Sequence, residues 1–201
     1  MTIYDLKPQF QTLLQPVMQW LADQGVTPNA ITLSAMVGSV LVGGSLPTAT
    51  RFPVLLLLLP IWLLLRMALN AIDGMLAKQL RMATRLGAVL NELGDVVSDL
   101  SLFVPLAVLH PPARWPILIF AIGGVMTEFC GVLAQAIGGR RQYGGPMGKS
   151  DRAFFVGVLG LISYFSPTVF RFWAAAFLIG ACLSVVTCLN RVAAAVKETH
   201  D

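Results

Sequence analysis

The chain has 201 residues, of which 56% are hydrophobic and only 12% are charged. A soluble domain of this size cannot bury so much apolar surface, because small domains leave a large part of their surface in water. The composition therefore excludes a disordered chain, a secreted disulfide scaffold and an ordinary cytosolic enzyme, and it predicts an integral membrane protein.

The net charge of +4 comes from 14 Lys and Arg against 10 Asp and Glu. These positive charges separate apolar runs and do not form one soluble basic face, so we expect membrane lipid, and no nucleic acid, as the partner. The three cysteines, Cys130, Cys182 and Cys188, lie in apolar stretches and form no CxxC pair. We interpret them as small hydrophobic residues of the interior.

Residues 1–26 form the first segment, which has neither the apolar core nor the cleavage site of a signal peptide. Residues 2–23 are too polar to cross a membrane, but their apolar side chains recur at helical spacing. These apolar residues are Leu6, Phe10, Leu13, Leu14, Val17, Met18 and Leu21. The pattern predicts an amphipathic helix lying in the membrane surface. Thr27-Pro28-Asn29 is typical of the start of the next helix.

Six apolar stretches follow. A helix needs about 20 residues to cross the hydrocarbon core. They lie near residues 28–48, 53–80, 84–110, 114–138, 150–166 and 168–195. We therefore expect an all-α integral membrane protein with six transmembrane helices after the amphipathic surface helix. The predicted single domain covers residues 1–201, divided into the surface segment 1–26, the membrane domain 28–195 and a cytoplasmic tail 196–201.

The positive charges also predict the orientation. With the N-terminus in the cytoplasm, ten Lys and Arg lie on the cytoplasmic side and three lie outside, and Arg66 falls within a span. The cytoplasmic ones are Lys7, Lys78, Arg81, Arg85, Arg140, Arg141, Lys149, Arg152, Arg191 and Lys197, and the external ones are Arg51, Arg114 and Arg171. This excess predicts that both ends of the chain are cytoplasmic.

Five acidic residues fall inside the predicted spans: Asp73, Glu92, Asp95, Asp99 and Glu128. Ionisable groups are costly in a membrane and usually mark functional sites. Asn91, Asp95 and Asp99 are four residues apart, so they share one helix face. Because a short turn near residues 79–84 joins the second and third spans, we expect Asn70 and Asp73 to face these residues.

Carboxylates that meet in a low dielectric repel one another unless a cation joins them. Oxygen ligands without His or Cys suit Mg²⁺, Mn²⁺ or Ca²⁺. Gly74 and Gly87 leave the backbone uncovered beside the carboxylates, so a ligand could come close. The same residues are also consistent with a polar patch that joins helices, or with an ion or proton relay.

Residues 70–95 resemble the signature of the CDP-alcohol phosphatidyltransferase family, D-x2-D-G-x2-A-R-x8-G-x3-D-x3-D. The matching residues are Asn70, Asp73, Gly74, Ala77, Lys78, Gly87, Asn91 and Asp95, and every spacing is kept. Thr27-Pro28-Asn29 resembles the start of the family's first membrane helix. Gly148-Lys149 resembles a Gly-Lys of its phosphatidylglycerophosphate-synthase branch. The expected six spans also match the family fold, so the resemblance covers nearly the whole chain.

The resemblance implies a reaction of phospholipid biosynthesis. A phosphatidyl group would move from CDP-diacylglycerol to an alcohol acceptor, with release of CMP. The resemblance further implies a homodimer in the bacterial inner membrane, with an active site that opens to the cytoplasm.

The resemblance also implies roles for the signature residues. In the family the first three Asp bind one or two divalent metals, Mg²⁺ or Mn²⁺, and the fourth is the proposed general base. The implied metal ligands are therefore Asn70, Asp73, Asn91 and Asp95, with Asp95 also as the base. Because the two amides bring no charge, two fully occupied metals are less expected, and Asp99 is a candidate for the missing charge.

Other positions are implied to bind substrates. For the donor these are Asn29, Thr32, Gly74, Lys78 and Gly87. A basic cluster of Arg140, Arg141, Lys149 and Arg152 is expected beside the cytoplasmic mouth, with Glu128 facing the acceptor. This cluster either binds a phosphate of the acceptor or donor, or only sets the topology. Asp151 interrupts the basic run expected after Gly-Lys, which weakens the case for glycerol 3-phosphate.

Two other functions stay open. Asn70 and Asn91 favour a degenerate family member that binds a nucleotide lipid without turnover. Acids inside the membrane also suit a small ion-coupled or proton-coupled protein, although this does not explain the signature spacing. Release of CMP from CDP-diacylglycerol separates the transferase from both.

Overall fold

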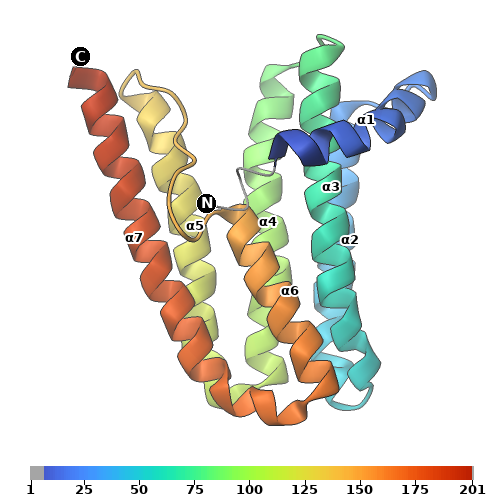
Figure 1. Cartoon of the computed structure of the whole chain (residues 1–201), viewed down its shortest axis with the longest axis vertical. Coiled ribbons are helices and arrows are strands. Elements are labelled where there is room, and N and C mark those ends of the chain that lie inside the picture. The colour runs from blue at the N-terminus through green and yellow to red at the C-terminus, as the bar shows by residue number, and fades with distance from the viewer. Residues whose placement is uncertain (1–6, 201) are drawn as a thin grey trace.

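The computed structural model describes residues 7–200, with side chains for residues 10–198, and this part of the chain is helical without any strand. The first helix, α1 (Lys7–Asp23), is followed by six further α-helices. These are α2 (Pro28–Ser45), α3 (Leu58–Gln79), α4 (Arg85–Leu109), α5 (Arg114–Ala136), α6 (Lys149–Phe165) and α7 (Trp173–His200). Helices α2 to α7 run along one another as a bundle, and α1 crosses α3 (Figure 1).

Each of the six predicted spans is a helix in the structure. Four helical stretches of the described residues are long and apolar enough to cross a membrane: Pro28–Thr50, Pro53–Gln79, Pro111–Ala136 and Pro167–Glu198. The other two predicted spans are not among these four, because α4 carries Glu92, Asp95 and Asp99 and α6 has only 17 residues. The protein is therefore a multi-pass membrane protein.

Prolines and hydroxyl groups set the helix ends. Short 3-10 turns that begin at or beside a proline lie at Leu46–Thr50, Pro53–Leu57, Pro111–Ala113 and Pro167–Phe172. The side chain of Thr27 accepts a hydrogen bond from the backbone of Ala30 at 3.3 Å, and Pro28 is the first residue of α2. Thr84 caps α4 in the same way, accepting from the Gly87 backbone at 2.9 Å.

The predicted surface helix lies in part outside the described residues, because its residues 2–6 and the side chain of Leu6 do so. The described part is α1, which buries Met18 against Ile72, Met75 and Leu76 of α3. Leu13 and Trp20 are exposed on its other side. The predicted tail, residues 196–201, overlaps the end of α7, which continues as a helix to His200. Hydropathy detects where apolar character ends, but a helix can continue into water.

The apolar core fills the end of the bundle away from α1. Phe103, Phe120, Trp173 and Phe177 are almost fully buried there, and the Phe120 and Phe177 rings are 5.3 Å apart in an edge arrangement. Helix α6 begins well inside the bundle, where the segment after α5 descends to meet it (Figure 1). The first turn of α6 therefore lies beside the acids of α4.

Candidate functional site

The signature residues of α3 and α4 meet through their side chains. The amide nitrogen of Asn70 donates a hydrogen bond to Oδ1 of Asp95 at 2.8 Å. Both carboxylates of the signature are buried, with exposed fractions of 4% for Asp73 and 3% for Asp95. The expectation that Asn70 and Asp95 face each other is therefore met.

The start of α2 completes this part of the site. The hydroxyl of Thr32 lies 2.9 Å from Oδ2 of Asp73 and also bonds to the Pro28 carbonyl. A Cβ atom at Gly87 would lie only 2.8 Å from Oδ1 of Asn29, whereas one at Gly74 would meet nothing within 4 Å. The predicted donor-binding residues Asn29, Thr32 and Gly87 thus converge, and open space lies beside Gly74. Lys78 is exposed near the end of α3.

Asp95 is bonded on both carboxylate oxygens. Its Oδ1 accepts from Asn70 and, at 3.2 Å, from Arg66, and its Oδ2 accepts from Nζ of Lys149 at 2.6 Å. Lys149 is the first residue of α6, and its side chain is 32% exposed. The Gly-Lys of the sequence therefore reaches the same carboxylate that the signature places on α4.

Asp99 lies one turn deeper between two guanidinium groups. Its Oδ1 is 2.5 Å from Nη1 of Arg66, and its Oδ2 is 2.9 Å from Nε of Arg152. Since both oxygens hold buried arginines, Asp99 is poorly placed to supply a metal ligand. We therefore leave it out of the ligand set proposed below.

The side chains of this site offer oxygen ligands for a divalent cation. No group of three or more His, Cys, Asp or Glu in the described residues could hold a metal ion. The candidate ligands on α3 and α4 are the carboxylate of Asp73, which forms no ion pair among the described residues, the amides of Asn70 and Asn91, and the ion-paired Asp95. Such hard, weakly charged ligands fit one Mg²⁺ or Mn²⁺, and they do not fit two.

The basic residues expected at the cytoplasmic mouth separate in the structure. Arg152 has no exposed area, because the first turn of α6 lies inside the bundle. It donates to Asp99, to Thr127, to Glu128 at 2.8 Å and to the Met147 carbonyl. The side chain of Arg140, in contrast, is 93% exposed and pairs with Glu198. The predicted cluster is therefore not one surface.

Glu128 and Glu92 hold the next arginine. Nη2 of Arg141 lies 2.6 Å from Glu92 and 2.8 Å from Glu128, and its guanidinium carbon lies 4.5 Å from the centre of the Tyr143 ring. Burial lowers the pKa of the Arg141 guanidinium, but the two carboxylates outweigh this and raise that pKa above its ordinary value. Arg141 is therefore a charged and largely enclosed group.

Sequence reasoning missed the roles of Arg66, Glu92 and Arg191. Arg66 lies four residues before Asn70 on the same face of α3, and an arginine within a span is itself a signal of function. Arg191 donates to the backbone carbonyls of Thr127 and Gly144. No local pattern of α7 indicates that partnership, because it depends on the path of the segment after α5.

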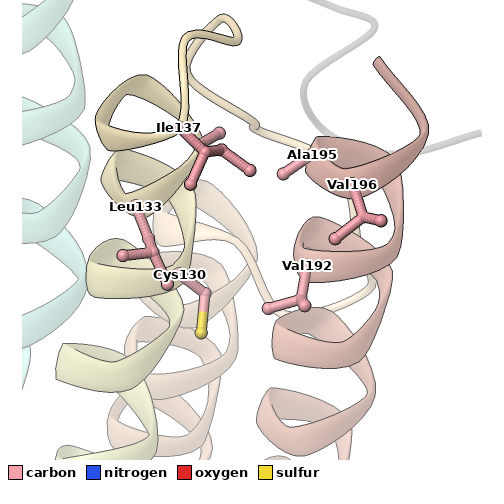
Figure 2. A pocket seen from close by; sticks show the side chains of 7 residues that line it. Cys130, Leu133, Ile137, Val192, Ala195 and Val196 are labelled. Atoms are coloured by element: carbon pink, nitrogen blue, oxygen red, sulfur yellow. The ribbon is translucent and has the colours of Figure 1, made fainter. Parts of the chain in front are cut away.

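An apolar pocket lies between α5 and α7 on another part of the molecule (Figure 2). Its lining consists of Cys130, Leu133, Ala134, Ile137, Val192, Ala195 and Val196. It presents no charged group and so lacks the chemistry for a phosphate or a metal.

Comparisons with known proteins identify the family of the chain. Residues 25–191 match the family model of the CDP-alcohol phosphatidyltransferases. The chain is 47% identical over 191 residues to inner membrane protein YnbA of Escherichia coli K12, covering 95% of this chain and 94% of that protein.

Two solved structures share the fold. Phosphatidylinositol phosphate synthase PgsA1 of Mycobacterium tuberculosis with CDP-DAG bound has a TM-score of 0.75 at 23% identity, covering 90% of this chain and 92% of that one. The same enzyme in complex with manganese and citrate gives a TM-score of 0.75 at 23% identity, covering 90% and 88%. With these matches over nearly its whole length, the chain belongs to the CDP-alcohol phosphatidyltransferase family and is a membrane transferase of that kind.

Proposed function

We propose that the protein transfers a phosphatidyl group from CDP-diacylglycerol to an alcohol acceptor and releases CMP. One observation carries this proposal. The signature residues Asn70, Asp73 and Asp95 of α3 and α4 are joined by hydrogen bonds to one another or to Thr32 of α2. The bound CDP-DAG in PgsA1, which shares the fold, supports the choice of donor. The direct test is release of CMP from CDP-diacylglycerol by the purified protein when an acceptor is supplied.

One divalent cation, Mg²⁺ or Mn²⁺, would be held by Asp73 and Asp95 together with the amide oxygens of Asn70 and Asn91. When bound, it supplies charge for the diphosphate and polarises the phosphoryl oxygens. The manganese complex of PgsA1 supports this assignment. Asn29, Thr32, Gly74, Lys78 and Gly87 would border the donor, since open space lies beside Gly74.

Asp95 would accept the proton of the attacking hydroxyl. In the described structure its Oδ2 is bonded to Lys149, so that oxygen becomes available only when the ammonium group moves. The Lys149 side chain is long and 32% exposed, and the diphosphate of a bound donor would attract it. Donor binding would thus uncover the base. Positioning and electrostatics supply most of the rate in phosphoryl transfer.

The arrangement of the helices in the membrane is also part of this proposal. All six helices α2 to α7 would span a bacterial inner membrane, with α1 on its surface, the site open to the cytoplasm and two copies forming a homodimer. The similarity to an inner membrane protein supports this location.

Cysteine labelling tests the orientation. Thr50 is exposed between α2 and α3, and a Cβ at Gly144 would meet nothing within 4 Å, so both positions accept a cysteine. In a variant with Cys130, Cys182 and Cys188 changed to serine, Thr50→Cys should react with an impermeant maleimide on intact cells. Gly144→Cys should react only after permeabilisation, and the reverse pattern would show the opposite orientation.

Removing the charge of Asp73 tests the metal. Asp73→Asn should weaken Mn²⁺ binding by more than the about 10–100-fold that loss of an outer partner costs, because Asp73 is the one acidic residue of α3. Electron paramagnetic resonance of Mn²⁺ measures this without turnover, and a chelator should abolish CMP release. Asp23→Asn, at an exposed position at the end of α1, is the matched control. Equal Mn²⁺ affinity in the two variants would refute the assignment.

A degenerate member that binds the donor without turnover is the second candidate. Two amides stand where the family signature has carboxylates, and both oxygens of Asp95 are bonded. Binding of CDP-diacylglycerol without CMP release, under any acceptor, would establish this alternative.

A further inference from the structure

The positive charges beside the proposed site are already neutralised inside the protein. Arg152 is fully buried, and its donors reach Asp99, Glu128, the Thr127 hydroxyl and the Met147 carbonyl. Arg191 is 2% exposed and donates to backbone carbonyls, with Glu128 at 3.7 Å. Neither guanidinium presents a free pair of N–H groups, which is what bidentate recognition of a phosphate needs.

Arg66 is paired with Asp95 and Asp99. In Arg141, two carboxylates occupy one of the terminal nitrogens. Glu92 and Glu128 both accept from Nη2, and the side chain is 9% exposed. Its Nε is the one buried side-chain nitrogen or oxygen of the described residues without a hydrogen-bond partner. A single N–H of this kind can donate to a hydroxyl oxygen, whereas the negative charge of a phosphate would face the two carboxylates.

The cluster as a whole carries no net charge. Its five cations are Arg66, Arg141, Lys149, Arg152 and Arg191, and its five anions are Asp73, Glu92, Asp95, Asp99 and Glu128. The diphosphate of the donor and one divalent ion would neutralise each other. A phosphate on the acceptor would add about −1.5 to −2 charges in a largely buried site whose buried cations already have carboxylate partners.

We infer that the acceptor is an alcohol without a phosphate group, such as a neutral polyol. Glu92 and Glu128 are then the residues that determine this specificity, because both carboxylates already accept from Nη2 of Arg141 and would repel a phosphate beside it. The inference rests on the proposed transferase function and names its substrate class.

Matched acceptor pairs test the inference during turnover. With CDP-diacylglycerol and Mn²⁺, glycerol is compared with glycerol 3-phosphate, and inositol with inositol 1-phosphate. In the pair that supports CMP release, we expect kcat/KM to be at least about tenfold higher for the unphosphorylated alcohol. A preference for the phosphorylated member would overturn the inference.

Binding provides a readout that does not depend on turnover. Equilibrium dialysis with radiolabelled glycerol 3-phosphate should show no saturable binding to the wild-type protein at millimolar concentration. Saturable binding to the wild type would overturn the inference, even if no acceptor releases CMP. Absence of CMP release with every acceptor would instead refute the proposed function.

Glu92→Gln tests whether Glu92 keeps a phosphorylated acceptor from binding at Arg141. The Glu92 side chain is 29% exposed, so its replacement is less disruptive than that of Glu128 at 5%. The variant should gain binding of glycerol 3-phosphate, because it leaves Arg141 with one carboxylate fewer. Glu198→Gln, which changes the partner of the exposed Arg140 and of Gln142 and leaves Arg141 untouched, should resemble the wild type. If neither Glu92→Gln nor Glu128→Gln gains binding while both stay folded, the assigned role of the two glutamates is wrong.

Discussion

Replacing Asp95 by asparagine is expected to lower turnover by about 10²–10⁴-fold, the range typical of a lost general base. The amide keeps the shape of the side chain but accepts a proton poorly. Arg66 retains its contact with Asp99, so the helices should stay in place. CMP release at saturating donor and Mn²⁺ measures the loss, and the variant should still bind donor in the same detergent.

Three further variants make this result specific. Asp23→Asn, at the exposed end of α1, is the matched change outside the site and should keep full turnover. Asn91→Asp should tighten Mn²⁺ binding if Asn91 is a ligand, because it restores a charged oxygen. If Asp95→Asn keeps near wild-type turnover while a folded Asp99→Asn is inactive, the base is Asp99 and the assignment is shifted by one turn.

Replacing Arg152 by methionine is expected to reduce the free energy of unfolding by about 3–5 kcal/mol, as removal of one partner of a buried ion pair does. Arg152 is fully buried and contacts both Asp99 and Glu128, so the variant leaves these carboxylates with one cation fewer. Unfolding in mixed micelles with increasing denaturing detergent measures the change.

Arg140→Met is the matched control for this prediction. Arg140 pairs with Glu198 at 2.9 Å, but its side chain is 93% exposed. Such surface pairs contribute about 0–1 kcal/mol. Equal stability of the two variants would show that the buried network of α4, α5 and α6 does not hold the bundle together.

The helices could be predicted from the sequence because apolar character sets both their length and their position. Thr27-Pro28 and Thr84 mark helix starts through local hydrogen bonds, which a short window of sequence contains. The facing of Asn70 and Asp95 also followed from sequence, since two antiparallel helices with a short turn leave few alternatives. The continuation of α7 to His200 did not follow from the sequence, because hydropathy measures apolar character and not helicity.

The ion pairs could not be predicted, because they depend on where α6 begins. The charge pattern placed Lys149 and Arg152 at the cytoplasmic mouth, as the positive-inside rule suggests. In the structure the segment after α5 carries them into the bundle, where they reach Asp95 and Asp99 (Figure 1). Their partners lie 54 and 53 residues away along the chain, which no spacing rule connects.

The most direct test of the proposed reaction is mass spectrometry of the lipids made by purified protein from CDP-diacylglycerol, Mn²⁺ and a panel of alcohols. We expect a new lipid in which the phosphatidyl group is joined to one unphosphorylated alcohol, with CMP formed in equal amount and both products formed about 10²–10⁴-fold more slowly by Asp95→Asn. Donor that binds the wild-type protein but is recovered unchanged with every alcohol would contradict it.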